Sequence, residues 1–154
     1  MKASLSFTWT LSGSGWADCT IADAVAEAQL IVSYITNAPE ELITAVTRIA
    51  LGEPGDRKVM FEAEPNGYLW ILSPDGEAVD IRIVEYADTS ARNRPGAVLW
   101  EAGHPIEVLA RSVLRGFDRV AADLGEDGWF ADWKRPFPRD ELEALRLAYR
   151  KLSP

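Results

Sequence analysis

Two turn signals, Asn66-Gly67 and Asp75-Gly76, each lie between runs of alternating apolar and polar residues in the middle of the chain. Dipeptides of this kind favour tight hairpin turns, because both residues tolerate positive φ angles. The region therefore predicts a central meander of three antiparallel strands over residues 58–86. In its first strand the alternation places three residues on the core side, Val59, Phe61 and Ala63.

Alternating apolar residues also predict strands on both sides of this meander. Residues 5–11 and 16–21 predict a hairpin, and residues 97–101 predict another strand. Residues 22–34 are ambiguous between helix and strand, because their first half is rich in alanine and their second half is β-branched. We expect a turn near Asp23 and a strand over residues 25–34.

Three helices are expected near residues 39–51, 105–124 and 138–151. Each has a proline in its first turn, and a glycine lies at or just past the end of the first two. The apolar stripe of the second helix, which runs from Ile106 to Leu124, is expected to cover the apolar side of the meander. The aromatic segment 127–135 shows no clear period and is expected to be a loop.

The order of strands, helix, strands and helices predicts an α+β fold, because it lacks the strand–helix–strand alternation of parallel sheets. We expect an antiparallel sheet of about six or seven strands with the helices packed mainly on one face. A chain of 154 residues without a recognisable linker predicts one domain spanning residues 1–154.

The charge of the chain favours one class of partner over another. The sequence has 24 acidic and 16 basic residues, for a formal net charge of −8. A field of that sign repels phosphate backbones, so we expect no nucleic acid as partner. It attracts cationic surfaces, so a basic protein is the expected partner.

Cys19 and His104 are the only cysteine and the only histidine. They cannot form an intrachain disulfide or a structural zinc site, which takes four such ligands. No catalytic motif accompanies His104, which is expected at the start of the second helix in a structural role. We therefore expect no catalytic residues, no metal and no cofactor. Without a long apolar run, the chain is expected to be cytoplasmic rather than in a membrane.

Two glutamates in the meander are candidates for a carboxylate pair. Glu62 and Glu64 are two residues apart on the expected strand and would share one face. Such a pair can supply acid catalysis, and it is also what the solvated face of a half-exposed sheet presents.

A surface for a protein partner is expected at aromatic and charged residues near the C-terminus. Aromatic and arginine side chains in an irregular segment suit an interaction hot spot, and they equally suit a loop strapped across the end of the core. The candidate partner-binding residues are Trp129, Trp133, Arg135, Glu62, Glu64, Asp123, Glu126 and Asp127.

Short segments along most of the chain resemble a known group of proteins. They are Gly15-Trp16, Ser33-Tyr34, Glu64-Pro65 followed by Trp70, and Trp133 with Phe137-Pro138. They resemble small acidic bacterial proteins that are largely uncharacterised, some of which are similar to immunity proteins of contact-dependent or polymorphic toxin systems. The resemblance implies a stoichiometric binder rather than an enzyme and brings no catalytic residues.

Three functions follow as hypotheses. The first is a non-enzymatic bacterial protein-binding module, such as an immunity-type inhibitor of a basic toxin. The second is a small-molecule-binding domain or hydrolase that uses Glu62, Glu64 or His104 in a pocket between sheet and helices. The third is a structural subunit that forms homo-oligomers through an exposed sheet face or edge.

Overall fold

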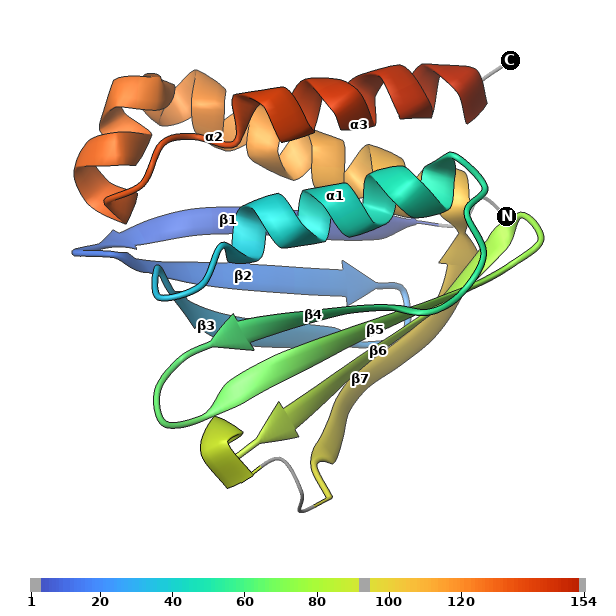
Figure 1. Ribbon diagram of the computed structural model, residues 1–154, viewed down its shortest axis with the longest axis horizontal. Coiled ribbons are helices and arrows are strands. Elements are labelled where there is room, and N and C mark those ends of the chain that lie inside the picture. Colours follow the sequence, from blue (N-terminus) through green and yellow to red (C-terminus); the bar gives the residue numbers. More distant parts are fainter. Residues whose placement is uncertain (1–3, 92–94, 153–154) are drawn as a thin grey trace.

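The fold is α+β, with seven antiparallel strands and three α-helices, as the sequence predicts (Figure 1). The computed structural model describes residues 4–91 and 95–152. The strands are β1 (Leu5–Gly13), β2 (Trp16–Asp23), β3 (Glu27–Ser33), β4 (Arg57–Glu62), β5 (Gly67–Asp75), β6 (Ala78–Tyr86) and β7 (Ala97–Pro105). The helices are α1 (Ala38–Ala50), α2 (Ile106–Trp133) and α3 (Arg139–Leu152), with a short 3-10 turn η1 (Thr89–Ala91).

The strands form two sheets rather than one. The first sheet has the order β1-β2-β3, and the second has the order β4-β5-β6-β7. The predicted meander is confirmed as β4, β5 and β6, and the ambiguous segment 22–34 contains the expected turn and strand, now β3. Val59, Phe61 and Ala63 are buried, so the predicted core side of the first meander strand is also confirmed.

One core lies between the two sheets and the helices. The rings of Phe7 and Trp70 connect the sheets at 6.3 Å, and those of Trp9 and Phe61 do so at 5.9 Å. Phe117 of α2 contacts the same Phe7 ring at 5.6 Å. The first sheet therefore covers much of the apolar side of the meander, which the sequence had assigned to the second helix alone.

Helix α2 packs mainly along β1. The Ser112 hydroxyl donates a hydrogen bond of 2.8 Å to the carbonyl oxygen of Leu5, and Gly116 lies against Phe7. The helix thus covers the free edge of β1, which would otherwise expose unpaired backbone groups. Figure 1 shows α1, α2 and α3 on the same side of the strands, as predicted.

The structure corrects the predicted end of the second helix. Gly125 does not end α2: it has non-helical angles (φ 70°, ψ 166°), and a further helical segment continues to Trp133. The predicted loop over residues 127–135 is therefore wrong for most of its length. Leu124, expected in the buried stripe, is exposed beside this break.

The start of α1 also differs in detail from the prediction. Asn37 precedes the helix as expected, but its side chain makes no capping hydrogen bond. Its Oδ1 instead accepts a hydrogen bond of 2.8 Å from Arg135. None of the described helices is long and apolar enough to cross a membrane.

Candidate protein-interaction surface

Three segments that are distant in the sequence meet at the tip of the β1–β2 hairpin. The Gly15 backbone N–H donates a hydrogen bond of 2.8 Å to the carbonyl oxygen of Asp132 in the last turn of α2. The Gly15 carbonyl accepts one of 2.9 Å from the Tyr34 N–H in the loop between β3 and α1. We call this region, with the α2 segment that follows Gly125, the hairpin end.

Glycine is required at position 15 for two reasons. Its φ of +83° is in the left-handed region, which strains residues with a side chain. A Cβ there would also lie 2.4 Å from the Tyr34 ring. The sequence thus brings Tyr34 close against the turn and holds its aromatic ring at the hairpin end.

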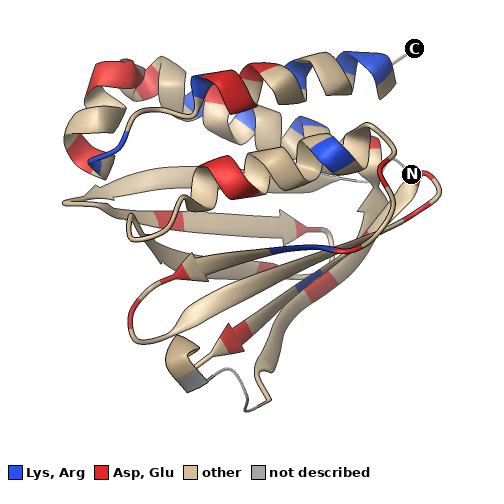
Figure 2. Cartoon of the chain, viewed as in Figure 1, with Lys and Arg blue, Asp and Glu red and all other residues tan. Residues whose placement is uncertain are grey.

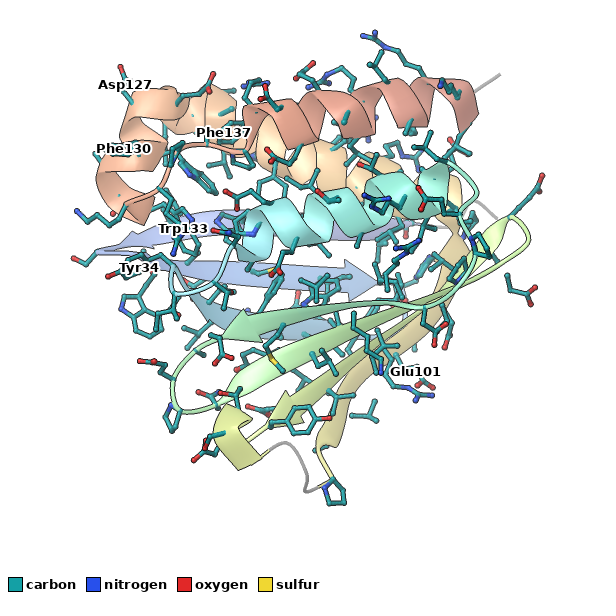
Figure 3. The ribbon with its side chains drawn as sticks, viewed as in Figure 1. Tyr34, Glu101, Asp127, Phe130, Trp133 and Phe137 are labelled. Atoms are coloured by element: carbon teal, nitrogen blue, oxygen red, sulfur yellow. The ribbon has the colours of Figure 1, made fainter. Side chains whose placement is uncertain are left out.

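The hairpin end carries the exposed aromatic side chains of the described residues. They are Trp16, Tyr34 and Phe130, which are 37%, 42% and 56% exposed, and Ile35 lies beside Tyr34 at 45%. Figure 3 shows Tyr34, Asp127 and Phe130 toward the same end of the molecule. Aromatic residues are enriched at protein interfaces, and gathered exposed apolar side chains mark interaction sites.

The α2 part of the hairpin end is acidic. Residues 126–133, the segment beyond Gly125, include three carboxylates and no lysine or arginine, and exposed Lys134 follows directly. Asp123 and Asp127 are exposed, Asp132 is half-buried, and Glu126 forms an ion pair of 3.4 Å with Arg139 of α3. Figure 2 shows this acidic segment at the end of α2. Of the candidate acids, Glu126 and Asp127 therefore lie in the hairpin end, and Asp123 lies just before Gly125.

Trp129 and Trp133 lie in the core rather than on the surface. Both are fully buried. Their ring centroids lie 6.2 Å and 5.5 Å from that of Trp9 on β1. Their spacing of four residues places both on one side of a helix. The prediction of a loop for this segment overlooked that spacing. Phe130, which was not predicted, is the aromatic residue that this segment exposes.

Arg135 connects segments within the chain. Its guanidinium donates hydrogen bonds to the Tyr34 carbonyl at 2.8 Å, to the Ile35 carbonyl at 3.4 Å and to Asn37 Oδ1 at 2.8 Å. These bonds hold the loop that carries Tyr34 and Ile35 against the end of α2. Arg135 thereby positions the exposed side chains of the hairpin end.

Glu62 and Glu64 do not share a face. Strand β4 ends at Glu62, whose carboxylate accepts a hydrogen bond of 2.8 Å from the Thr89 hydroxyl. Glu64 lies beyond the strand, is exposed and has a φ of 49°, so the period-2 alternation no longer applies to it. The predicted carboxylate pair is therefore not formed in this structure.

His104 is in β7 and not at a helix start, because that strand continues four residues further than predicted. Its Nε2 lies 2.9 Å from Asp23 Oδ2, and both side chains are buried. Asp23 Oδ1 accepts hydrogen bonds from the N–H groups of Val25 and Ala26. Burial acts to raise the pKa of Asp23, but the hydrogen bonds from Ala26, His104 and Val25 outweigh it and lower the pKa.

The residues considered for a hydrolase pocket do not converge. His104 is paired with Val79 near the start of β6, whereas Glu62 is level with Tyr86 at its end. Seven residues of strand separate these levels, which corresponds to about 23 Å. Within residues 4–91 and 95–152, no three His, Cys, Asp or Glu side chains lie close enough together to hold a metal ion.

Comparison with known proteins gives one distant structural neighbour. No family model matches the chain, and no curated protein is similar to it in sequence. A solved structure with a partial likeness is described as a "CdiA-CT/CdiI toxin and immunity complex from Enterobacter cloacae". The TM-score is 0.42 at 11% identity, and the match covers 75% of this chain and 99% of that chain. A likeness this distant does not assign a function.

Proposed function

We propose that this protein is a non-enzymatic binding module that uses the hairpin end to hold a basic protein, as an immunity-type inhibitor holds its toxin. The observation that carries the proposal is the combination, on one surface, of exposed aromatic side chains with a short segment, residues 126–133, that has three carboxylates and is followed by Lys134 and Arg135. The net charge of −8 supports a basic partner, because a field of that sign attracts cationic surfaces. The toxin as the class of partner follows from the resemblance of the sequence to immunity proteins.

The hairpin end suits tight binding because it is held in place before a partner arrives. Trp129 and Trp133 fix the acidic segment from the core side, and Arg135 fixes the loop that carries Tyr34. A preorganised surface loses little conformational entropy on binding. Exposed Phe130 and Tyr34 can then be buried as anchors, while the carboxylates around them attract the cationic partner.

The test compares three substitutions in binding to the product of the neighbouring gene, measured by calorimetry. Phe130→Ala and Asp127→Lys are each expected to weaken binding by roughly tenfold or more, the loss of about 1.4 kcal/mol or more. The matched control is Leu147→Ala on α3, because Leu147 is exposed to a similar extent but lies away from the hairpin end. It is expected to bind like the natural protein.

Protection of cells gives a second readout. Co-expression of this protein is expected to restore growth to cells that produce the partner, and Phe130→Ala is expected to reduce that protection. If the neighbouring protein binds equally well to all three variants, the hairpin end is not the binding surface. If it neither binds nor inhibits growth, the immunity-type function itself is contradicted.

A further inference from the structure

The outer face of the second sheet carries an apolar row that crosses all four strands. The strand register places Met60 beside Leu69, Leu69 beside Val84, and Val84 beside Val98. A bulge between β6 and β7 adds Leu99 at the end of this row. Val98 and Leu99 are 58% and 40% exposed, so β7 presents an apolar ridge to solvent.

The opposite end of the same row is hollow. A depression of about 770 Å³ lies beside β4, with Met60, Leu69 and Tyr86 among its lining residues and Lys58 and Glu62 also lining it. The segment before α1 and the first turn of that helix also border the hollow, through Thr36, Asn37 and Glu41, and η1 reaches the Gly67 end of the face, where Thr89 packs against the glycine. The face thus has a ridge on one side and a hollow on the other.

The next row along the strands has a charge at each end. Its register is Lys58, Ile71, Arg82 and Glu101, from β4 to β7. Arg82 forms an ion pair with Glu101, whereas exposed Lys58 forms none among the described residues. The positive charge of Lys58 lies on the side of the hollow, which Glu41 and Glu62 also line, and the negative charge of Glu101 lies on the side of the ridge.

We propose that the occupant of this face is a second copy of the chain, related by a two-fold axis that runs parallel to the strands between β5 and β6. Such an axis places β7 of each copy over β4 of the other. The Val98–Leu99 ridge of each copy then faces the hollow of the other. Lys58 of each copy faces Glu101 of the second copy on the same row. The contact of ridge with hollow and the pairing of Lys58 with Glu101 would therefore each occur twice in one interface.

The axis also brings the middle of the face onto itself, with half-buried Leu69 over β6 of the second copy, where Val84 is already buried beside Gly96. Two sheets that pack face to face bury their facing rows in this way. The proposed dimer interface uses other side chains than the hairpin end, and the two surfaces border each other at Asn37, which lines the hollow and accepts a hydrogen bond from Arg135. The inference is independent of the proposed function, because a dimer forms without any foreign partner.

The first test is sedimentation velocity over a range of concentrations up to about 1 mM, where weak dimers become visible. The natural protein is expected to shift from monomer to dimer. Val98→Asp is expected to raise the dissociation constant by at least roughly tenfold, because it places a charge in the ridge. Val25→Asp is the matched control, since Val25 is exposed in the turn between β2 and β3, and it is expected to dimerise normally.

The second test uses the charges. Lys58→Glu places two like-charge pairs in the proposed interface, and Glu101→Lys does the same with opposite sign. Each variant alone is expected to be monomeric at concentrations where the natural protein is dimeric. An equimolar mixture of the two is expected to form a heterodimer, because both pairs then have opposite charges.

Each outcome decides the proposal. Recovery of a dimer in the mixture supports the two-fold arrangement, because a general folding defect would not be repaired by mixing. A natural protein that stays monomeric at the highest concentration overturns the proposal. A dimer that is unaffected by Val98→Asp, or variants that dimerise alone, shows that another surface is used.

Discussion

A buried contact between two polar side chains connects the two sheets. Asp23 lies at the end of β2 in the first sheet, and His104 lies near the end of β7 in the second. Trp100, whose ring is parallel to that of His104, donates its indole N–H to the Ala26 carbonyl at 3.1 Å. Two polar contacts thus hold the β2–β3 turn of the first sheet against β7 of the second. Directional contacts of this kind fix the position of one sheet relative to the other better than apolar contacts alone.

Replacing Asp23 by Asn is expected to destabilise the protein by about 1–3 kcal/mol at pH 7, the value typical of charged hydrogen bonds. The folded state lowers the pKa of Asp23 below its ordinary 3.8. Its stabilisation is therefore complete above that value and is lost as the pH falls through the lower folded pKa. Urea unfolding at several pH values should show the difference between the two proteins shrinking below about pH 4.

The control is Asp18→Asn. Asp18 is exposed on β2 and lies outside this contact, so its substitution is expected to change stability by less than about 0.5 kcal/mol. A difference between Asp23→Asn and the natural protein that persists unchanged at acidic pH would show that packing, and not the carboxylate charge, accounts for it.

At the scale of elements, the contact between α2 and β1 depends on one glycine. A Cβ at Gly116 would lie 2.5 Å from the Phe7 ring and 2.7 Å from the Phe7 carbonyl oxygen. Such distances force the helix away from the strand. Because Phe7 connects both sheets to α2, a shift of the helix at this point disturbs the centre of the core.

Gly116→Ala is therefore expected to destabilise the protein by about 1–3 kcal/mol, the cost typical of overpacking. The intrinsic preference of helices for alanine acts in the opposite direction by about 1 kcal/mol, so the net loss measures the clash. Gly103→Ala on β7 is the control, because a Cβ there meets no atom within 4 Å. Thermal unfolding that ranks the two variants in the reverse order would contradict this account of the helix–strand contact.

The elements that the sequence predicts well are those whose signals are local. The meander follows from Asn66-Gly67 and Asp75-Gly76, and α3 follows from Pro138 and a regular apolar stripe. The end of α2 was missed because Gly125 has the usual appearance of a helix stop. Tertiary packing of Trp129 and Trp133 against the core, including Trp9 and Phe117, stabilises a second helical segment beyond it.

At the scale of the whole molecule, the strand count follows from the sequence and the division into two sheets does not. Pairing between strands that are adjacent in the chain is local, and every pair in both sheets is of this kind. Whether β3 pairs with β4 depends on the loop and α1 that separate them. The expectation of a basic partner came from the net charge, whereas the grouping of Trp16, Tyr34 and Phe130 depends on contacts between distant segments.

The net charge of −8 gives a prediction for the rate of binding. Association with a basic partner is expected to slow by roughly tenfold or more between low salt and about 0.5 M salt, because salt screens long-range attraction. Dissociation, which depends on the anchors Phe130 and Tyr34, is expected to change much less. Stopped-flow kinetics at several salt concentrations measures both rates. An association rate independent of salt would mean that the acidic surface does not guide the encounter.

The interruption of α2 at Gly125 has a consequence for how such a protein can change over generations. Beyond it, the inward residues Trp129 and Trp133 hold the short segment in place, while Glu126, Asp127 and Phe130 face outward. Substitutions at the outward positions leave the inward pair untouched. Evolution can therefore change the binding specificity of this segment by substituting its outward residues, while the packing of Trp129 and Trp133 in the core is kept.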